Sequence, residues 1–309
     1  MIMKKAVSMM LSFAIMMSCI VSAWAAGATM SVYSSYQIPS GTMRMIAHAG
    51  YSAVAPSNTL PAYEAAGKSD FWGAECDIQR TKDGVWILMH NDTVDDMTDG
   101  TGKVSELTYD EIMQFNVDVG SNIENYPGLK VARLEEYLDL CKKFGLHPVI
   151  EIKEKADPDY LYEVAAILSG RDEKDRFHVI SFGREICLKM KELMPALRVY
   201  FIVSYEDVSQ ENIDFAVSNH LDGMDIHVFH PDDYVKAVVA SGLDVFVWTI
   251  DDMENCERFY KLGVNAITTN SIHQEAPEGN GFQQFLWLLR DNWYRLISWF
   301  RAFFAGKTD

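Results

Sequence analysis

The sequence predicts an α/β protein built as a (β/α)8 TIM barrel, and three observations support this fold class. Short apolar runs alternate with amphipathic stretches of helical length along most of the chain. Such alternation is typical of a parallel sheet with crossover helices. Eight of the runs have strand length, and the chain of 309 residues is long enough for one barrel of about 250 residues. An open, doubly wound sheet is the alternative that the pattern alone leaves open.

The first 25 residues have the features of a secretory signal peptide. Lys4 and Lys5 precede an uncharged apolar run, and Ala23, Trp24 and Ala25 form a small-x-small cleavage signal. We expect residues 1–25 to be removed, residues 26–42 to lead into the barrel, and the protein to be secreted or associated with the cell surface. An uncleaved membrane anchor is the alternative.

The predicted strands lie in a barrel domain that we place at residues 43–274. They are Arg44–His48, Ala74–Ile78, Pro148–Ile152, His178–Phe182, Val199–Val203, Gly223–His227, Val245–Ile250 and Ala266–Thr269. The stretches between them predict helices over Thr59–Lys68, Leu134–Phe144, Pro158–Ser169, Arg184–Leu193, Glu206–Ser218, Asp232–Ala240 and Asp252–Leu262.

One further strand, Val85–His90, follows Ala74–Ile78 too closely for a helix to fit between them. Lys82, Asp83 and Gly84 have the composition of a hairpin turn. We therefore predict an extra β-ribbon that brings His90 back to the end of the strand carrying Asp77. The long polar stretch of residues 91–130 is expected to form an inserted loop region with one short helix near Thr108–Phe115.

Residues 275–309 predict a hinge followed by an amphipathic C-terminal helix. Between Phe282 and Phe304, apolar residues recur at helical spacing, while Trp287 and Trp299 lie outside the apolar face. Aromatic residues outside the stripe, together with nearby arginines, are typical of a helix that lies in a membrane interface. Packing on the barrel or on a second subunit is the alternative.

The composition restricts the partners and the use of cysteine. A formal net charge of −17 repels nucleic acid, so we expect no nucleic-acid partner. Cys76, Cys141, Cys187 and Cys256 lie in apolar runs or helical patterns and form no CxxC pair. They predict buried thiols, and neither a disulfide framework nor a zinc knuckle.

Three acidic residues lie on predicted strands in positions that allow them to converge. Residues two apart in a strand point the same way, so Glu75 and Asp77 share one face, as do Glu151 and Lys153. If that face is the barrel interior, three carboxylates meet near its top, which is costly unless a cation neutralises them. Ca²⁺ or Mg²⁺ suits oxygen ligands best.

Two histidines, His48 and His90, also fall at strand ends and supply possible proton carriers. Each residue taken singly has an ordinary structural alternative, such as a hydrogen-bonded strand histidine or an exposed acidic strand face. Their common placement at strand C-termini, where barrel enzymes keep their sites, favours a functional site.

In order and spacing, these motifs resemble those of the glycerophosphodiester phosphodiesterases, over roughly Met45 to Asn270. Besides the strand-end motifs, the resemblance rests on APSNTLPA at residues 55–62, TKDG at 81–84, HNDT at 90–93, DGTG at 99–102, VWT at 247–249 and GVNAITT at 263–269. The resemblance implies that the metal ligands are Glu75, Asp77 and Glu151, and that the general acid and base are His48 and His90. It further implies that Lys153 helps to hold phosphate and that Trp248 lines the substrate pocket.

The sequence departs from the pattern of this family at five positions. Ala49 stands where the family has Arg, and Ser57 where it has Glu. Asn91 and Asn270 each replace a usual Asp, and Asp96 replaces a common Arg. The Arg normally supplies a bidentate phosphate donor that the Glu could hold, so the loss of both suggests a coupled change in phosphate binding.

The leading hypothesis is therefore metal-dependent hydrolysis of glycerophosphodiesters to glycerol phosphate and an alcohol by histidine acid–base catalysis. A second hypothesis is a membrane-associated phosphodiesterase that acts on a lysophospholipid or a lipid-linked polymer. The third, favoured by Ala49 and Ser57, is a non-catalytic binding module on a decayed barrel.

Overall fold

The computed structural model of the protein describes residues 43–69, 71–153 and 155–272. The predicted signal peptide, the lead-in and the C-terminal hinge and helix lie outside the described residues. Within the described part, no helix has both the length and the apolar character needed to cross a membrane.

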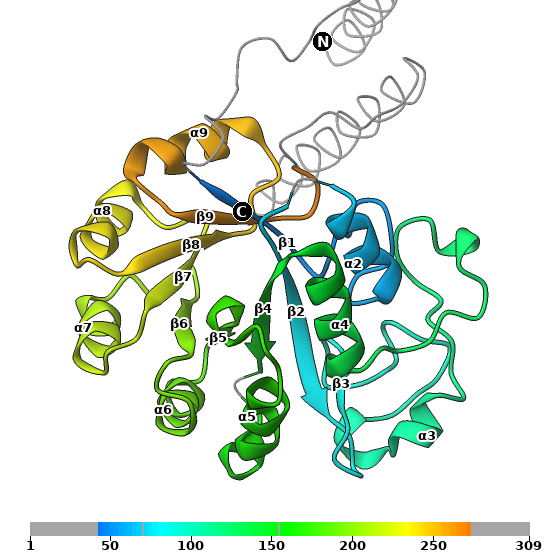
Figure 1. The fold of residues 1–309 in the computed structure, drawn as a ribbon. Coiled ribbons are helices and arrows are strands. Elements are labelled where there is room, and N and C mark those ends of the chain that lie inside the picture. Colours follow the sequence, from blue (N-terminus) through cyan, green and yellow to red (C-terminus); the bar gives the residue numbers. More distant parts are fainter. Residues whose placement is uncertain (1–42, 70, 154, 273–309) are drawn as a thin grey trace, which may run out of the picture. The chain divides into compact units, whose positions relative to one another are not determined.

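Eight parallel strands form a closed barrel (Figure 1). They are β1 (Arg44–Ala47), β2 (Gly73–Arg80), β4 (His147–Ile152), β5 (His178–Ser181), β6 (Arg198–Val203), β7 (Gly223–His227), β8 (Asp244–Trp248) and β9 (Ala266–Thr269). Each strand pairs with its neighbours, and β1 closes the barrel by pairing with both β2 and β9. The predicted (β/α)8 fold is confirmed, and the open sheet is excluded.

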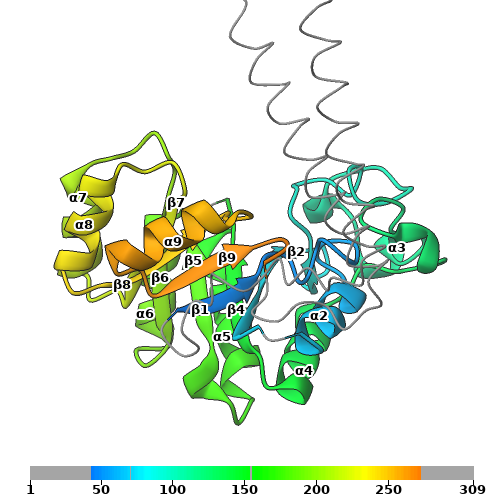
Figure 2. The same ribbon diagram turned by 90° about the horizontal axis from the view of Figure 1, so that it is seen from above.

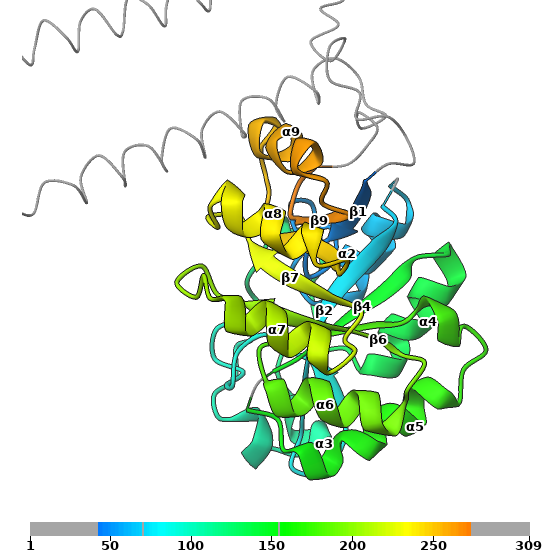
Figure 3. The same cartoon turned by 90° about the vertical axis from the view of Figure 1, so that its left-hand side faces the viewer.

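Helices lie outside the strands, as Figure 2 and Figure 3 show for the neighbouring pairs α2 with α4 and α8 with α9. They are α2 (Leu60–Gly67), α4 (Leu134–Phe144), α5 (Leu161–Ser169), α6 (Arg184–Leu193), α7 (Gln210–Ser218), α8 (Asp232–Ala240) and α9 (Met253–Leu262). The helices α2 and α9 begin one residue later than predicted, and α5 and α7 begin later still. A separate 3-10 turn, η3 (Pro158–Tyr160), precedes α5, and α7 begins after Ser209, whose extended backbone is that of an N-cap residue.

The extra ribbon is confirmed by β3 (Trp86–Leu88), which pairs antiparallel with the end of β2. Gly84 has φ +89 in the connecting turn, a conformation that favours glycine. The Met89 N–H donates to the Asp77 carbonyl at 3.0 Å. This hydrogen bond brings the chain back beside the strand that carries Asp77, as predicted.

The insertion that follows the ribbon is more ordered than a loop. It contains α3 (Tyr109–Ile112), which begins at a capping box of Thr108 and Glu111, and the 3-10 turns η1 (Val104–Glu106) and η2 (Ile123–Asn125). Buried side chains of the insertion, of β3 and of the adjoining residues form an apolar cluster, called here the insertion core, which comprises Ile87, Met89, Val94, Val104, Ile112, Val117 and Val131.

The barrel interior has an apolar middle and a polar pair near the N-terminal ends of the strands. The middle comprises Ile46, Val149, Ile180, Tyr200, Ile202, Phe246 and Ala266. Toward the N-terminal ends, Arg44 forms a 2.7 Å ion pair with Asp244, to which the Tyr200 hydroxyl donates at 2.8 Å. The Arg44 guanidinium also lies 4.8 Å from the ring centre of Trp72. The Arg44–Asp244 pair fills the interior at the N-terminal ends of the strands. The candidate site lies toward the opposite, C-terminal ends.

The four cysteines within the described residues are buried and unpaired, as expected: Cys76, Cys141, Cys187 and Cys256.

Candidate active site

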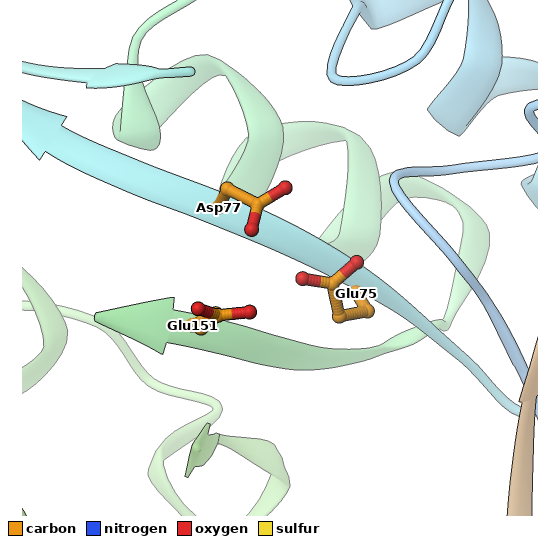
Figure 4. Close-up of side chains that lie close together, drawn as sticks. All are labelled: Glu75, Asp77 and Glu151. Carbon is orange, nitrogen blue, oxygen red and sulfur yellow. The ribbon is translucent and has the colours of Figure 1, made fainter. Parts of the chain in front are cut away.

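Three carboxylates converge inside the barrel, on β2 and near the C-terminal end of β4 (Figure 4). Glu75 and Asp77 project from β2, and Glu151 projects from β4, where it is the register partner of Asp77. One oxygen from each carboxylate lies within 4.8 Å of the others. The sequence prediction that these residues converge is therefore confirmed, and we call them the carboxylate cluster.

Backbone and side-chain donors hold two members of the carboxylate cluster in place. The Ala49 N–H donates to Glu75 Oε2 at 2.8 Å. Asn58 binds Asp77 twice, because its Nδ2 donates to Oδ2 at 2.7 Å and its Oδ1 accepts from the Asp77 N–H at 3.1 Å. The Tyr63 hydroxyl donates to the same Asn58 oxygen at 3.0 Å. Asn58 belongs to the APSNTLPA motif, but the sequence alone did not reveal its contact with Asp77.

Lys153 lies directly against the carboxylate cluster. Its ammonium donates to Glu151 Oε1 at 2.8 Å and also to Asp77 Oδ1. Burial acts to lower the pKa of Lys153, but the charges of Asp77 and Glu151 outweigh it, so the pKa is raised. The side chain therefore stays positively charged at neutral pH.

A single ammonium does not neutralise three carboxylates, of which Glu75 and Asp77 are buried and Glu151 is largely buried. Burial, followed by the charges of Asp77 and Glu151, raises the pKa of Glu75 well above its usual value. Burial and the charge of Asp77 likewise raise the pKa of Glu151 to about 7. Burial acts to raise the pKa of Asp77, but the charges of Lys153 and His90 outweigh burial, so the pKa of Asp77 is lowered. The site thus retains unfavourable carboxylate repulsion that a further cation would relieve.

The two candidate histidines lie near the carboxylate cluster. His48 follows β1 and immediately precedes Ala49, whose N–H binds Glu75. His90 follows the ribbon, close enough for its charge to act on Asp77 and Glu151. Each histidine has an asparagine oxygen at hydrogen-bond distance from Nδ1: Asn270 at 2.8 Å from His48 and Asn91 at 2.6 Å from His90.

Trp248 lies at the end of β8, among aromatic side chains from neighbouring strand ends. Its ring makes edge contacts with His227 at 4.7 Å and Phe182 at 5.8 Å between ring centres. Tyr205 and Phe229 extend this group past His227 and are 52% and 74% exposed. We call these five residues the aromatic rim. The sequence analysis identified only Trp248, although Phe182 and His227 also stand at predicted strand ends.

Asp225 is a further interior carboxyl that the sequence analysis missed. It projects from β7, is 2% exposed, and its Oδ1 has no hydrogen-bond partner among the described residues. Burial, with a smaller contribution from Glu151, raises the pKa of Asp225 well above its usual value, so that the neutral acid is favoured. Its alternation with Gly223 and His227 along the strand was the available signal.

A closed (β/α)8 barrel with carboxylates, a lysine and histidines at the C-terminal ends of its strands defines a class of barrel enzymes that can combine a bound cation with proton transfer. Comparison with known sequences identifies the family within that class. The chain belongs to the glycerophosphoryl diester phosphodiesterase family, which it matches over residues 48–274. Membership in this family of hydrolases argues against the non-catalytic binding module.

Individual relatives agree with this assignment. The chain is 38% identical over 273 residues to glycerophosphodiester phosphodiesterase 1 of Homo sapiens, which covers 77% of this chain and 81% of that protein. It is 30% identical over 249 residues to a glycerophosphodiester phosphodiesterase of Bacillus subtilis, covering 73% of this chain and 82% of the relative. A phosphodiesterase of Oleispira antarctica, solved with the product sn-glycerol-3-phosphate, has the same fold with a TM-score of 0.68 at 24% identity, over 74% of this chain and 92% of that one.

Proposed function

We propose that this protein hydrolyses glycerophosphodiesters to glycerol phosphate and an alcohol, with a divalent cation held by the carboxylate cluster. One observation carries the metal-dependent part of the proposal: Glu75, Asp77 and Glu151, the first two of them buried, each offer an oxygen within 4.8 Å of the others. The signal-peptide features of residues 1–25 add the proposal that it acts outside the cytoplasm.

The residues present fit a hard divalent cation. Ca²⁺ and Mg²⁺ bind carboxylate oxygens, and Glu75, Asp77 and Glu151 offer such oxygens close together. The pKa values of Glu75 and Glu151 are raised first by burial and then by the neighbouring carboxylates, so ionising these groups is costly, and a bound cation would lower that cost. When bound, the cation would supply Lewis-acid polarisation of a phosphate oxygen. Lys153 adds a positive charge at the same end of the barrel, suited to the substrate phosphate.

The proton transfers fall to His48 and His90. Hydrolysis requires a base that takes the proton of the attacking hydroxyl and an acid that protonates the leaving oxygen. Two histidines near the carboxylate cluster provide one group for each task. Trp248 and the rest of the aromatic rim would form a wall of the substrate pocket.

The aromatic rim favours a second candidate substrate class. Tyr205 and Phe229 present rings that are 52% and 74% exposed. An apolar leaving group, such as the acyl-bearing alcohol of a lysophospholipid, would cover such rings. A surface helix at residues 275–309 would support this activity by holding the enzyme at a membrane.

The experiment that tests the proposed function measures turnover and metal binding separately. We expect Glu151→Gln to weaken Mg²⁺ or Ca²⁺ binding in calorimetry and to abolish turnover of glycerophosphodiesters. His48→Ala and His90→Ala should still bind metal but lose about 10²–10⁴-fold in turnover each. Glu192→Gln, at a side chain that is 69% exposed, is the matched control. A Glu151→Gln protein with normal activity and metal demand would exclude the proposed metal site.

A substrate comparison separates the two candidate classes. The assay runs glycerophosphocholine beside lysophosphatidylcholine, with wild-type protein and Phe229→Ala. If the rim binds acyl chains, Phe229→Ala raises KM for the lysolipid and leaves KM for the soluble diester unchanged. Equal effects on both substrates would remove the lipid candidate.

A further inference from the structure

The side chain of His48 is connected through an asparagine to a carboxylate. His48 Nδ1 lies 2.8 Å from Asn270 Oδ1, and the Asn270 Nδ2 donates to Asp251 Oδ2 at 2.6 Å. The backbone supports the same approach, because the His48 N–H donates to the Thr269 carbonyl at 2.9 Å. Strand β9 therefore delivers Asn270 to the side of the histidine ring.

The direction of this chain of hydrogen bonds is fixed by chemistry. An ionised carboxylate accepts hydrogen bonds and cannot donate them. The Asn270 NH₂ group must therefore face Asp251, which turns the amide oxygen toward His48. The Ser52 hydroxyl, which donates to the same oxygen at 3.0 Å, is consistent with that orientation.

Asp251 is itself anchored through its other oxygen. Its Oδ1 accepts from the Asn270 N–H at 2.7 Å, from Thr269 Oγ1 at 2.9 Å and from Ser271 Oγ at 3.4 Å. Three donors on one oxygen hold the carboxylate in a single orientation, so the second oxygen stays directed at Asn270.

We propose that Asp251 and Asn270 are positioning residues that fix the tautomer of His48. An amide oxygen only accepts, so His48 Nδ1 carries the hydrogen and Nε2 is the ring nitrogen that exchanges a proton with substrate. The catalytic meaning of this tautomer rests on the proposed function, in which His48 is an acid or a base.

A second histidine, His90, has the same arrangement, although its partners follow β3 and not β8 or β9. His90 Nδ1 lies 2.6 Å from Asn91 Oδ1, and the Asn91 NH₂ group donates to Asp96. The Asp96 carboxylate therefore orients the amide in the same way. Both histidines are held with Nδ1 protonated, by a neutral amide that places no additional negative charge directly beside the ring.

Replacing Asp251 by Asn tests the direction of the chain of hydrogen bonds. In Asp251→Asn, the three donors at Oδ1 retain the amide oxygen there, so the new NH₂ group faces Asn270. The Asn270 amide must then flip and donate to His48 Nδ1, which forces the hydrogen onto Nε2. Adding Asn270→Asp to Asp251→Asn places a carboxylate at position 270, which accepts hydrogen bonds both from the new amide at position 251 and from His48. The hydrogen then returns to Nδ1 of His48.

The readout is the long-range ¹H–¹⁵N spectrum of the histidine rings in the full chain, recorded at a pH where they are neutral. A His48→Gln protein identifies the resonances. We expect the Nδ1–H tautomer in the wild type, Nε2–H in Asp251→Asn, and Nδ1–H again in the double variant. The turnover rate constant should fall about 10²-fold or more in Asp251→Asn at nearly constant KM and recover in the double variant.

Two further variants keep the inference falsifiable. Asp252→Asn is the control, because that neighbouring carboxylate accepts from the Asn255 N–H at 2.8 Å as the N-cap of α9. If Asp251→Asn fails to fold, Asp96→Ala at the exposed second site should lower the Nδ1–H fraction of His90. An Nε2–H tautomer in the wild type overturns the inference. So does a double variant that does not return to the Nδ1–H tautomer. Absence of phosphodiesterase activity in the wild type would instead refute the proposed function and leave the tautomer result standing.

Discussion

Arg44 Nη2 lies 2.7 and 2.8 Å from the two carboxylate oxygens of Asp244, and this ion pair joins the N-terminal ends of β1 and β8 inside the barrel. The Tyr200 hydroxyl donates to the same carboxylate. The pair and the carboxylate cluster therefore stand at opposite ends of the interior, which separates a stabilising contact from a functional one.

Asp244→Ala should lower stability without changing catalysis. The substitution leaves Arg44 unpaired beside Trp72 and removes the acceptor of Tyr200, which should cost about 2 kcal/mol, because both charges are partly exposed. Urea unfolding measures the loss, and kcat at a temperature well below the transition should match that of wild type. Asp233→Ala, in an ion pair whose aspartate is 99% exposed, is the control and should change neither quantity. A fall in kcat in Asp244→Ala would contradict the idea that the ion pair acts on stability alone.

The metal-free protein should lose stability as pH rises from about 4.5 to about 7. Burial and the charge of Asp77 raise the pKa of Glu151 to about 7 in the folded state. A group with a raised folded pKa contributes stability that is complete below its unfolded pKa, near 4.3, and is lost as pH rises through the folded value. The loss should be roughly 1–3 kcal/mol.

Thermal unfolding in a chelator across this pH range measures the effect. In Glu151→Gln, the slope with pH should be smaller, because the titrating carboxyl has gone. Mg²⁺ or Ca²⁺ should restore the stability of the wild type at pH 7 and have little effect on the variant. A pH-independent wild type would refute the charge distribution described for the carboxylate cluster.

Restoring the family's charged pair should improve phosphate binding only when both members return. Ala49 is buried at φ +52, with its N–H on Glu75, and Ser57 is exposed nearby in the chain. We expect Ala49→Arg with Ser57→Glu to lower KM for glycerophosphodiesters by more than the product of the two single effects. The four KM values of the double-mutant cycle give the coupling. Simple additivity would tell against a coupled loss.

Asp225→Asn should stabilise the protein at pH 7.5 but not at pH 4. Burial raises the pKa of Asp225, so the stability contributed by the neutral acid is lost as pH rises above its unfolded value, whereas Asn stays neutral throughout. Urea unfolding at the two pH values should show a gain of about 1 kcal/mol or more at the higher one. Asp172→Asn, at a side chain that is 98% exposed, should show no such difference. An equal shift at both pH values would mean that Asp225 does not titrate on unfolding.

Local periodicity predicted the barrel because each strand and helix carries its own signal. Gly223–His227 and Ala266–Thr269 have the predicted bounds, as do α4, α6 and α8. The convergence of Glu75 with Asp77 followed from the alternation of a strand, and the return of His90 followed from the hairpin turn.

Contacts across the barrel had no such local signal. Asn270 lies 222 residues from His48, and only barrel closure through β1 and β9 brings the two together. Asp225 lies between Met224 and Ile226, so the apolar residues of this strand predicted its presence but not that its carboxyl lies in the interior. The insertion was expected to be mostly loop because its apolar residues lack a regular period, although they form a core of their own.

The separation of the insertion core from the interior of the barrel has an evolutionary consequence. The two groups of apolar side chains are distinct, and the antiparallel β2–β3 ribbon joins the segments that carry them. The insertion core is therefore carried by one contiguous module of the chain, residues 87–131. His90 lies at the start of this module, whereas the three carboxylates stay on the strands. Substitutions within this module can therefore change His90 and its surroundings while Glu75, Asp77 and Glu151 on β2 and β4 stay as they are.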